Sequence, residues 1–160
     1  MPIKVGDSFP EVTLKQVGPD GLVDLHTAEL TAGRKIVLFA VPGAFTPTCS
    51  VRHLPGFIDH ADDFKAKGVD IIACLSVNDP WVMDAWAKDT GAEGTILMLP
   101  DGNGELAAAL DLPLDASANG LGTRIKRFAM VIDDGIVTDL QIEAPGKLEV
   151  SSAEALLVRF

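Results

Sequence analysis

The sequence predicts a fold of the α/β class, built on a central mixed β-sheet flanked by helices. Between residues 36 and 111, short apolar runs typical of buried strands alternate with segments of helical period, which favours parallel strands joined by helices. Two strand-like segments joined by a tight turn and a final helix follow, and these add antiparallel strands. With 160 residues, 48% of them apolar, the chain can bury one sizeable core. We therefore expect a single domain over residues 1–160.

The first predicted elements are an N-terminal β-hairpin and three buried strands. Residues 12–17 and 22–25 are strand-like, and the Gly-Pro-Asp-Gly sequence at 18–21 is typical of the turn between them. The apolar runs that predict the buried strands lie at residues 36–41, 69–77 and 95–99.

Three helices are predicted around these strands. The first begins near Cys49, and the Pro-Gly pair at 55–56 should interrupt it before Gly68 ends it. The second follows a cap at Asp79, and a short alanine-rich helix is expected at 105–111. The apolar stripe of the second helix is expected to consist of Trp81, Val82, Ala85 and Trp86.

The C-terminal part of the chain predicts a loop, a strand pair and a helix. Residues 113–122 are rich in small residues, and we expect them to form a loop that makes one wall of the functional site. Strands at 128–132 and 136–143 are joined by an Asp-Asp-Gly turn. A last helix is expected to start at Ser151, with Glu154 closing a capping box.

The charge of the chain limits its partners. Thirteen basic residues against 23 acidic ones give a net charge of −10, which disfavours nucleic acid and anionic membrane surfaces. There is no signal-like N-terminal segment and no apolar run close to the length that spans a bilayer. With two cysteines and no disulfide-scaffold pattern, we expect a soluble, cytoplasmic protein that acts on a small neutral or apolar substrate.

The segment 42–49, Pro-Gly-Ala-Phe-Thr-Pro-Thr-Cys, organises the predicted site. It places Cys49 after the strand 36–41, at the point where a helix begins. Unpaired N–H groups and the dipole at a helix start stabilise an anion, so the thiolate is favoured over the thiol. Thr46 is expected to cap this helix and to direct its hydroxyl toward the sulfur. Pro42 is expected to fix the loop and to screen the thiolate from water.

The pattern Pro-x-x-x-Thr-x-x-Cys, formed by Pro42, Thr46 and Cys49, resembles the active-site signature of the peroxiredoxins. The resemblance covers nearly the whole chain and weakens only near the C-terminus. Its similarity to the type II, or peroxiredoxin-five, group rests on the strings at 41–50, 53–57 and 74–79. The resemblance implies a thioredoxin-like fold and a thiol peroxidase that reduces hydrogen peroxide and alkyl hydroperoxides without a cofactor. It also implies a homodimer through the face near Phe45, Thr46 and Trp81.

Attack by the thiolate on a peroxide requires hydrogen-bond donors beside the sulfur. Peroxiredoxins carry an arginine at the start of a late strand, and Arg127 is similar in position to it. Arg124, three residues earlier, is the alternative, although we expect it to be a solvated charge at a strand end.

The product, a Cys49 sulfenic acid, must be reduced by a second thiol. Some members of the family have a resolving cysteine near the C-terminus, where this chain has Val-Ser-Ser at 150–152. Cys74 is the one internal candidate, and its strand context favours a buried, inert thiol. We therefore expect a one-cysteine mechanism that takes electrons from glutathione or a glutaredoxin, or from thioredoxin.

Several alternatives stay open. A redox sensor or relay that passes oxidation from Cys49 to a partner protein would share the first step. A disulfide exchanger is disfavoured because the chain has no Cys-x-x-Cys, and a purely structural domain would not need Arg127. His53 lies four residues after Cys49 and would allow a Cys–His dyad, although packing at the helix end, beside Arg52, is favoured. No metal site is expected, because His26 has no second ligand at metal spacing.

Overall fold

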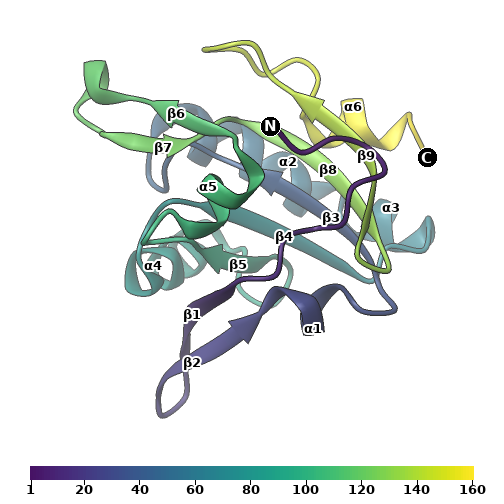
Figure 1. Ribbon diagram of the computed structural model, residues 1–160, viewed down its shortest axis with the longest axis horizontal. Helices are drawn as coiled ribbons and strands as arrows, with labels where there is room; N and C mark the ends of the chain where they lie inside the picture. The colour runs from purple at the N-terminus through teal and green to yellow at the C-terminus, as the bar shows by residue number, and fades with distance from the viewer.

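The centre of the molecule is a five-stranded mixed sheet, seen in a computed structural model that describes residues 1–160. Its strands, in spatial order, are β5 (Leu97–Pro100), β4 (Ile71–Ser76), β3 (Lys35–Ala40), β8 (Phe128–Asp133) and β9 (Ile136–Ile142). β3 pairs in parallel with β4 and antiparallel with β8 (Figure 1). The predicted mixed sheet and its three central apolar strands are therefore confirmed.

Helices and the N-terminal segment cover the two faces of this sheet. Because side chains alternate along a strand, Val37 and Phe39 of β3 enter one core cluster and Ile36 and Leu38 the other. The first cluster is closed by α2 (Leu54–Asp59), α3 (Ala61–Ala66), α4 (Pro80–Thr90) and α6 (Ala153–Leu157), and the second by α5 (Glu105–Leu110). A β-α-β unit followed by a strand pair and a helix is the thioredoxin-like fold.

Two small hairpins extend from this body (Figure 1). The first, β1 (Thr13–Gly18) and β2 (Gly21–His26), is the predicted N-terminal hairpin, and it leads into a short helix, α1 (Thr27–Thr31), that was not predicted. The second pairs β6 (Pro113–Asp115) with β7 (Thr123–Ile125), so the expected loop at 113–122 is partly strand. Three-residue strands are too short for the alternation by which a sequence reveals them.

The helix after the active-site loop is built differently from the prediction. Residues Cys49–His53 form a π-helical segment, and Pro55 and Gly56 lie inside α2 rather than interrupting it. Proline is tolerated there because it falls in the first turn of α2, where its missing N–H has no helical partner to lose. The interruption comes at His60, whose φ of −99° and ψ of 11° separate α2 from α3.

α4 begins and ends as predicted, but its buried face is shifted. The Asp79 carboxylate accepts a hydrogen bond from the Val82 N–H at 2.8 Å, and Gly91 ends the helix with a left-handed φ of 77°. Its buried residues are Met83, Trp86 and Ala87. Of the expected stripe, Trp86 is buried and Val82 packs against the core, whereas Trp81, 63% exposed, and Ala85 face solvent, so the prediction was wrong for these two residues.

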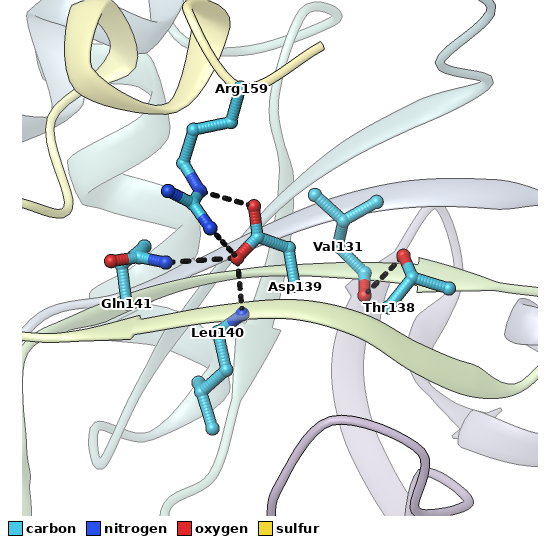
Figure 2. A network of polar contacts seen from close by, with 6 residues as sticks. All are labelled: Val131, Thr138, Asp139, Leu140, Gln141 and Arg159. Atoms are coloured by element: carbon cyan, nitrogen blue, oxygen red, sulfur yellow. Dashed lines mark hydrogen bonds and ion pairs between the residues drawn. The ribbon is translucent and has the colours of Figure 1, made fainter.

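The cap of the C-terminal helix lies one residue after the expected position. Ser152, not Ser151, caps α6 by accepting a hydrogen bond from the Ala155 N–H at 3.1 Å. Just beyond α6, Arg159 forms a two-point ion pair with Asp139 of β9, at 2.5 and 3.1 Å (Figure 2). Because this carboxylate also accepts hydrogen bonds from Leu140 and Gln141, the end of the chain is fixed to the sheet edge.

The β8–β9 pair is irregular in its middle. The register shifts between Val131 and Ile132, which leaves Thr138 without a strand partner. Its hydroxyl donates to the Val131 carbonyl at 3.3 Å instead, as Figure 2 shows.

None of the helices combines the length and apolar composition that a bilayer span requires.

Candidate active site

Cys49 lies just past the carboxyl end of β3, on the face of the sheet that α2 covers. The chain leaves β3 at Ala40, turns sharply at Phe45 with a left-handed φ of 64°, and becomes helical at Pro47. The Thr46 carbonyl accepts the first helical hydrogen bond, from the Ser50 N–H at 3.0 Å, so Thr46 lies at the helix start as predicted. Cys49 is only 1% exposed. The thiol is thus held inside the protein at the end of a central strand.

Arg127 lies directly against this thiol. Its Nη2 atom donates a hydrogen bond to Cys49 Sγ at 3.0 Å. The contact follows from the sheet, because Ala40 at the end of β3 pairs with Phe128 at the start of the antiparallel strand β8. Residues 78 positions apart in the chain are thereby brought to the same sheet edge.

Arg124 has a different position from the one expected. It is half-buried rather than solvated, and its guanidinium donates to the carbonyls of Leu121 and Val77 at 2.9 and 2.8 Å. A Cβ atom added to Gly43 would lie 3.0 Å from the Thr46 methyl group and 3.6 Å from Arg124 Nη1. Arg124 therefore packs against the back of the active-site loop and does not contact the sulfur.

His53 contacts the arginine and not the cysteine. Its Nδ1 lies 2.7 Å from Arg127 Nη1, and its Nε2 lies 2.8 Å from the Ser151 carbonyl. Because the carbonyl can only accept, the proton is on Nε2, and Nδ1 accepts from the guanidinium. Burial and the adjacent Arg127 charge lower the pKa of His53 to about 3. A neutral histidine thus orients the guanidinium, and the structure shows no Cys–His dyad.

Glu143, at the end of β9, fixes the segment that supports His53. Its Oε2 accepts hydrogen bonds at 2.7 to 2.9 Å from the N–H groups of Glu149, Val150 and Ser151 and from the Ser151 hydroxyl. Burial alone would raise the pKa of this carboxyl, but these hydrogen bonds bring it below the ordinary value. No pattern in the sequence predicted this arrangement, because a glutamate at a strand end is usually solvated.

The active-site loop has two further supports. The Thr46 hydroxyl donates to the Gly43 carbonyl at 2.6 Å, so its single hydrogen is committed and its lone pairs stay available as acceptors. The Asn78 side-chain oxygen accepts from the Ala44 N–H at 3.0 Å and from the Ser76 hydroxyl at 2.6 Å. The contact of Asn78 with the loop was not predicted.

A cavity of about 380 Å³ lies beside Thr48 and Arg127, two neighbours of Cys49, although Cys49 itself does not line it. Pro42, Thr48 and Arg127 line one side of it. The opposite walls come from residues 114–119 and from residues 142–147 after β9, so the segment predicted to form a wall of the site does so in part.

Cys74, the second cysteine, is enclosed in the core. It lies in the middle of β4, paired with Phe39 of β3 on one side and Met98 of β5 on the other, and it is fully buried. Burial, with a further contribution from the charge of Cys49, raises the pKa of the Cys74 thiol well above its ordinary value. Both cysteines are free thiols. No group of three or more His, Cys, Asp or Glu side chains is arranged to hold a metal ion.

The thioredoxin-like sheet places a buried thiol at the end of a central strand, in contact with a guanidinium. This arrangement is typical of the class of thiol-based redox enzymes. The Redoxin family profile matches residues 4–157. The chain is 54% identical to peroxiredoxin-2E-2, chloroplastic, of Oryza sativa subsp. japonica, over 97% of this chain and 71% of that protein. It is 47% identical to peroxiredoxin-2B of Arabidopsis thaliana, over 98% of this chain and 97% of that one.

A solved structure also shows the similarity to peroxiredoxins. The crystal structure of reduced Prx3 in complex with H2O2 from Vibrio vulnificus is similar to this chain with a TM-score of 0.94 and 52% identity, over 98% of both chains. The chain belongs to the type II peroxiredoxins of the redoxin family, and it is a thiol peroxidase.

The state of His53 leads to a testable pH dependence. The pKa of His53 in the folded protein lies below the ordinary value of 6.5. Between pH 6.5 and about 3, this histidine is therefore protonated to a greater extent in the unfolded chain than in the folded one. Stability should therefore fall on acidification across this window, by up to about 1.4 kcal/mol per pH unit from this group. An NMR titration should show no His53 transition between pH 5 and 8, and His53→Gln should weaken the acid dependence of urea unfolding. A His53 midpoint near 6.5 would contradict the buried, neutral assignment.

Proposed function

We propose that this peroxiredoxin reduces hydrogen peroxide and alkyl hydroperoxides through a Cys49 sulfenic acid in a one-cysteine cycle. The observation that carries the proposal is the 3.0 Å contact between the buried Cys49 thiol and Arg127, which also lines a cavity. Electrons come from an external thiol, glutathione or a glutaredoxin, with thioredoxin as another donor. The similarity to a protein crystallised with H2O2 supports hydrogen peroxide as a substrate.

In the proposed first step, the Cys49 thiolate attacks the distal peroxide oxygen. The O–O bond breaks, the sulfur becomes a sulfenic acid, and the departing oxygen leaves as an alcohol or as water after it gains a proton. Arg127 stabilises the thiolate and the charge that develops on the departing oxygen. Because the hydrogen of Thr46 is bound to the Gly43 carbonyl, we assign Thr46 as the acceptor of the peroxide O–H, and not as the donor first expected.

Pro42 is proposed to exclude water from the reacting atoms. It is half-buried and lines the cavity beside Arg127, so it separates the thiol from solvent on that side. A dry site strengthens the charge interactions of Arg127 with both sulfur and peroxide.

The one-cysteine assignment rests on the position of Cys74. Its strand is hydrogen-bonded on both sides, so moving its backbone toward Cys49 would break two strand ladders. Burial also keeps Cys74 as a thiol, which is the unreactive form.

The proposal has three further parts, which concern the domain organisation, the location and the assembly of the protein. Residues 1–160 form one redoxin domain, because both core clusters lie on the two faces of one sheet. Free, unpaired thiols support a cytoplasmic location. A homodimer is proposed through the face near Phe45, Thr46 and Trp81, and the exposed apolar side chains of Phe45 and Trp81 support it. Sedimentation velocity of Phe45→Glu would test the dimer by a shift to monomer. The same face would serve a redox relay, in which Cys49 passes its oxidation to a partner protein.

The proposal is tested by the intact mass of the protein after one equivalent of hydrogen peroxide, with and without a sulfenic-acid trap. We expect a trapped adduct on Cys49. A loss of two hydrogens without an adduct would indicate a Cys49–Cys74 disulfide and would overturn the one-cysteine cycle. An unchanged mass would overturn the assignment of Cys49 as the peroxide-reducing thiol.

A further inference from the structure

We propose that the cavity beside Arg127 binds an anionic peptide thiol, which reduces the Cys49 sulfenic acid while Lys126 contacts its carboxylate. The inference rests on the proposed one-cysteine function, because only that cycle needs an external thiol at this site. It assigns a binding site, and a residue outside the peroxide chemistry, to the second half of the cycle.

The size of the cavity is the first argument. Its volume of about 380 Å³ is an order of magnitude above the roughly 30 Å³ share of one water molecule, and hydrogen peroxide is only slightly larger than water. Small-molecule sites in proteins typically span about 300 to 1,000 Å³. The cavity therefore fits a molecule of the size of a short peptide.

The charges of the cavity are the second argument. Lys126 lines it, is exposed, and makes no side-chain hydrogen bond or ion pair. Lys147 lines it as well, with only an exposed pair to Glu149 at 3.8 Å. With the guanidinium of Arg127, three cations meet in a protein whose net charge is −10. This local excess of positive charge favours an anion.

Each of the two carboxylates of the cavity accepts hydrogen bonds through one of its oxygens, and neither is paired with Lys126. Asp115 accepts hydrogen bonds from the Ser117 N–H and hydroxyl at 3.0 and 2.6 Å. Glu143 is buried, and its Oε2 accepts four hydrogen bonds from the segment that ends at Ser151. Lys126 consequently has no partner within the site, and its ammonium is free to contact a ligand carboxylate.

The position of the cavity connects it to the chemistry. Arg127 contacts Cys49 Sγ and lines the cavity, and Thr48 next to Cys49 lines it too. A thiol whose carboxylate is held by Lys126 would thus lie beside the two residues that adjoin the sulfur it must reach. Apolar walls from Leu114 and Ile142 would pack against its methylene groups.

The reduction consumes two thiols. The sulfur of the bound thiol attacks the sulfenic sulfur, the S–O bond breaks, and the hydroxyl leaves as water with the thiol's proton, which forms a mixed disulfide on Cys49. A second thiol releases its proton to water and attacks the peptide sulfur of this disulfide as a thiolate. The S–S bond breaks, Cys49 departs as the thiolate, and the oxidised peptide disulfide is released.

The test is a stopped-flow single-turnover experiment in two stages on the full chain. Stage one oxidises the protein with hydrogen peroxide or with cumene hydroperoxide, and stage two reduces the sulfenic acid with glutathione or with the neutral thiol 2-mercaptoethanol. Lys126→Gln is compared with wild type and with Lys65→Gln, which removes the same charge from an exposed position on α3.

We expect Lys126→Gln to slow reduction by glutathione about five-fold at low salt, as the loss of one exposed charge contact predicts. The difference should shrink at high salt. Reduction by 2-mercaptoethanol, and oxidation by both peroxides, should be unchanged, and Lys65→Gln should match wild type throughout.

Four results would overturn the inference. Equal glutathione rates in Lys126→Gln and wild type would remove Lys126 from the site, and equal slowing with both thiols would show a general disturbance. Slower oxidation by cumene hydroperoxide alone would assign the cavity to the organic group of the peroxide. If wild type forms no sulfenic acid in stage one, the proposed function fails before any thiol is added, and this inference fails with it.

Discussion

Replacing Cys49 with serine should reduce peroxide turnover to background, a loss of at least about 1,000-fold. A serine hydroxyl is not ionised at neutral pH, so Arg127 would contact a poor nucleophile where it now contacts Sγ at 3.0 Å. The measurement is the rate of peroxide consumption with glutathione and glutaredoxin as the reducing system. Residual activity within ten-fold of wild type would mean that another group attacks the peroxide.

The matched control for this variant is the other cysteine. Cys74→Ser should keep most of the turnover, because Cys74 is enclosed between β3 and β5 and takes no part in the proposed cycle. A hydroxyl without a partner in this core would cost about 1 to 3 kcal/mol of stability, so Cys74→Ala is the cleaner second variant. Loss of turnover in folded Cys74→Ala would make Cys74 a resolving thiol.

Replacing Arg127 with methionine should lower the second-order rate constant for peroxide by about 100- to 1,000-fold, the usual cost of one donor to a developing oxyanion. Methionine keeps much of the side-chain volume but removes both the charge and the donors to Sγ and His53. Competition kinetics against a peroxidase of known rate would measure the change.

Two comparisons make the Arg127 result specific. Arg52→Met removes an equal charge from an exposed residue three positions after Cys49, and it should leave the rate within two- to three-fold of wild type. Arg127→Lys should fall between wild type and Arg127→Met, because an ammonium keeps the charge but lacks the fork that reaches His53 and the sulfur together. A rate for Arg127→Met within ten-fold of wild type would contradict the role proposed for the guanidinium.

Structural features that depend on a few consecutive residues were predictable from the sequence. The apolar run at 36–41 predicted β3, and the Gly-Pro-Asp-Gly turn predicted the first hairpin. The spacing of Pro42, Thr46 and Cys49 indicated the family, which the redoxin profile and the similar peroxiredoxins confirm. Such features depend on backbone conformation and burial within a few residues, which local composition controls.

Features that depend on precise local geometry were predicted less well. The Pro-Gly pair at 55–56 suggested an interruption, but the π-helical segment before it places Pro55 in a first turn where it fits. Similarly, two adjacent serines could each cap α6, and Ser152 does so because Ser151 is already engaged by Glu143. A one-residue choice of this kind depends on a partner elsewhere in the chain.

The sequence by itself thus determined the sheet, the hairpin, the position of the reactive cysteine and, through the family resemblance, Arg127 as its neighbour, whereas only the tertiary structure decided how this arginine is held against the sulfur. Arg127, His53 and Glu143 are brought together through β8, β9 and the segment that ends at Ser151. These contacts join residues far apart in the chain. Neither the hydrophobic periodicity nor a sequence motif indicates which distant carbonyl a buried histidine will contact. Their selection follows from strand pairing and from the requirement that every buried polar group find a partner.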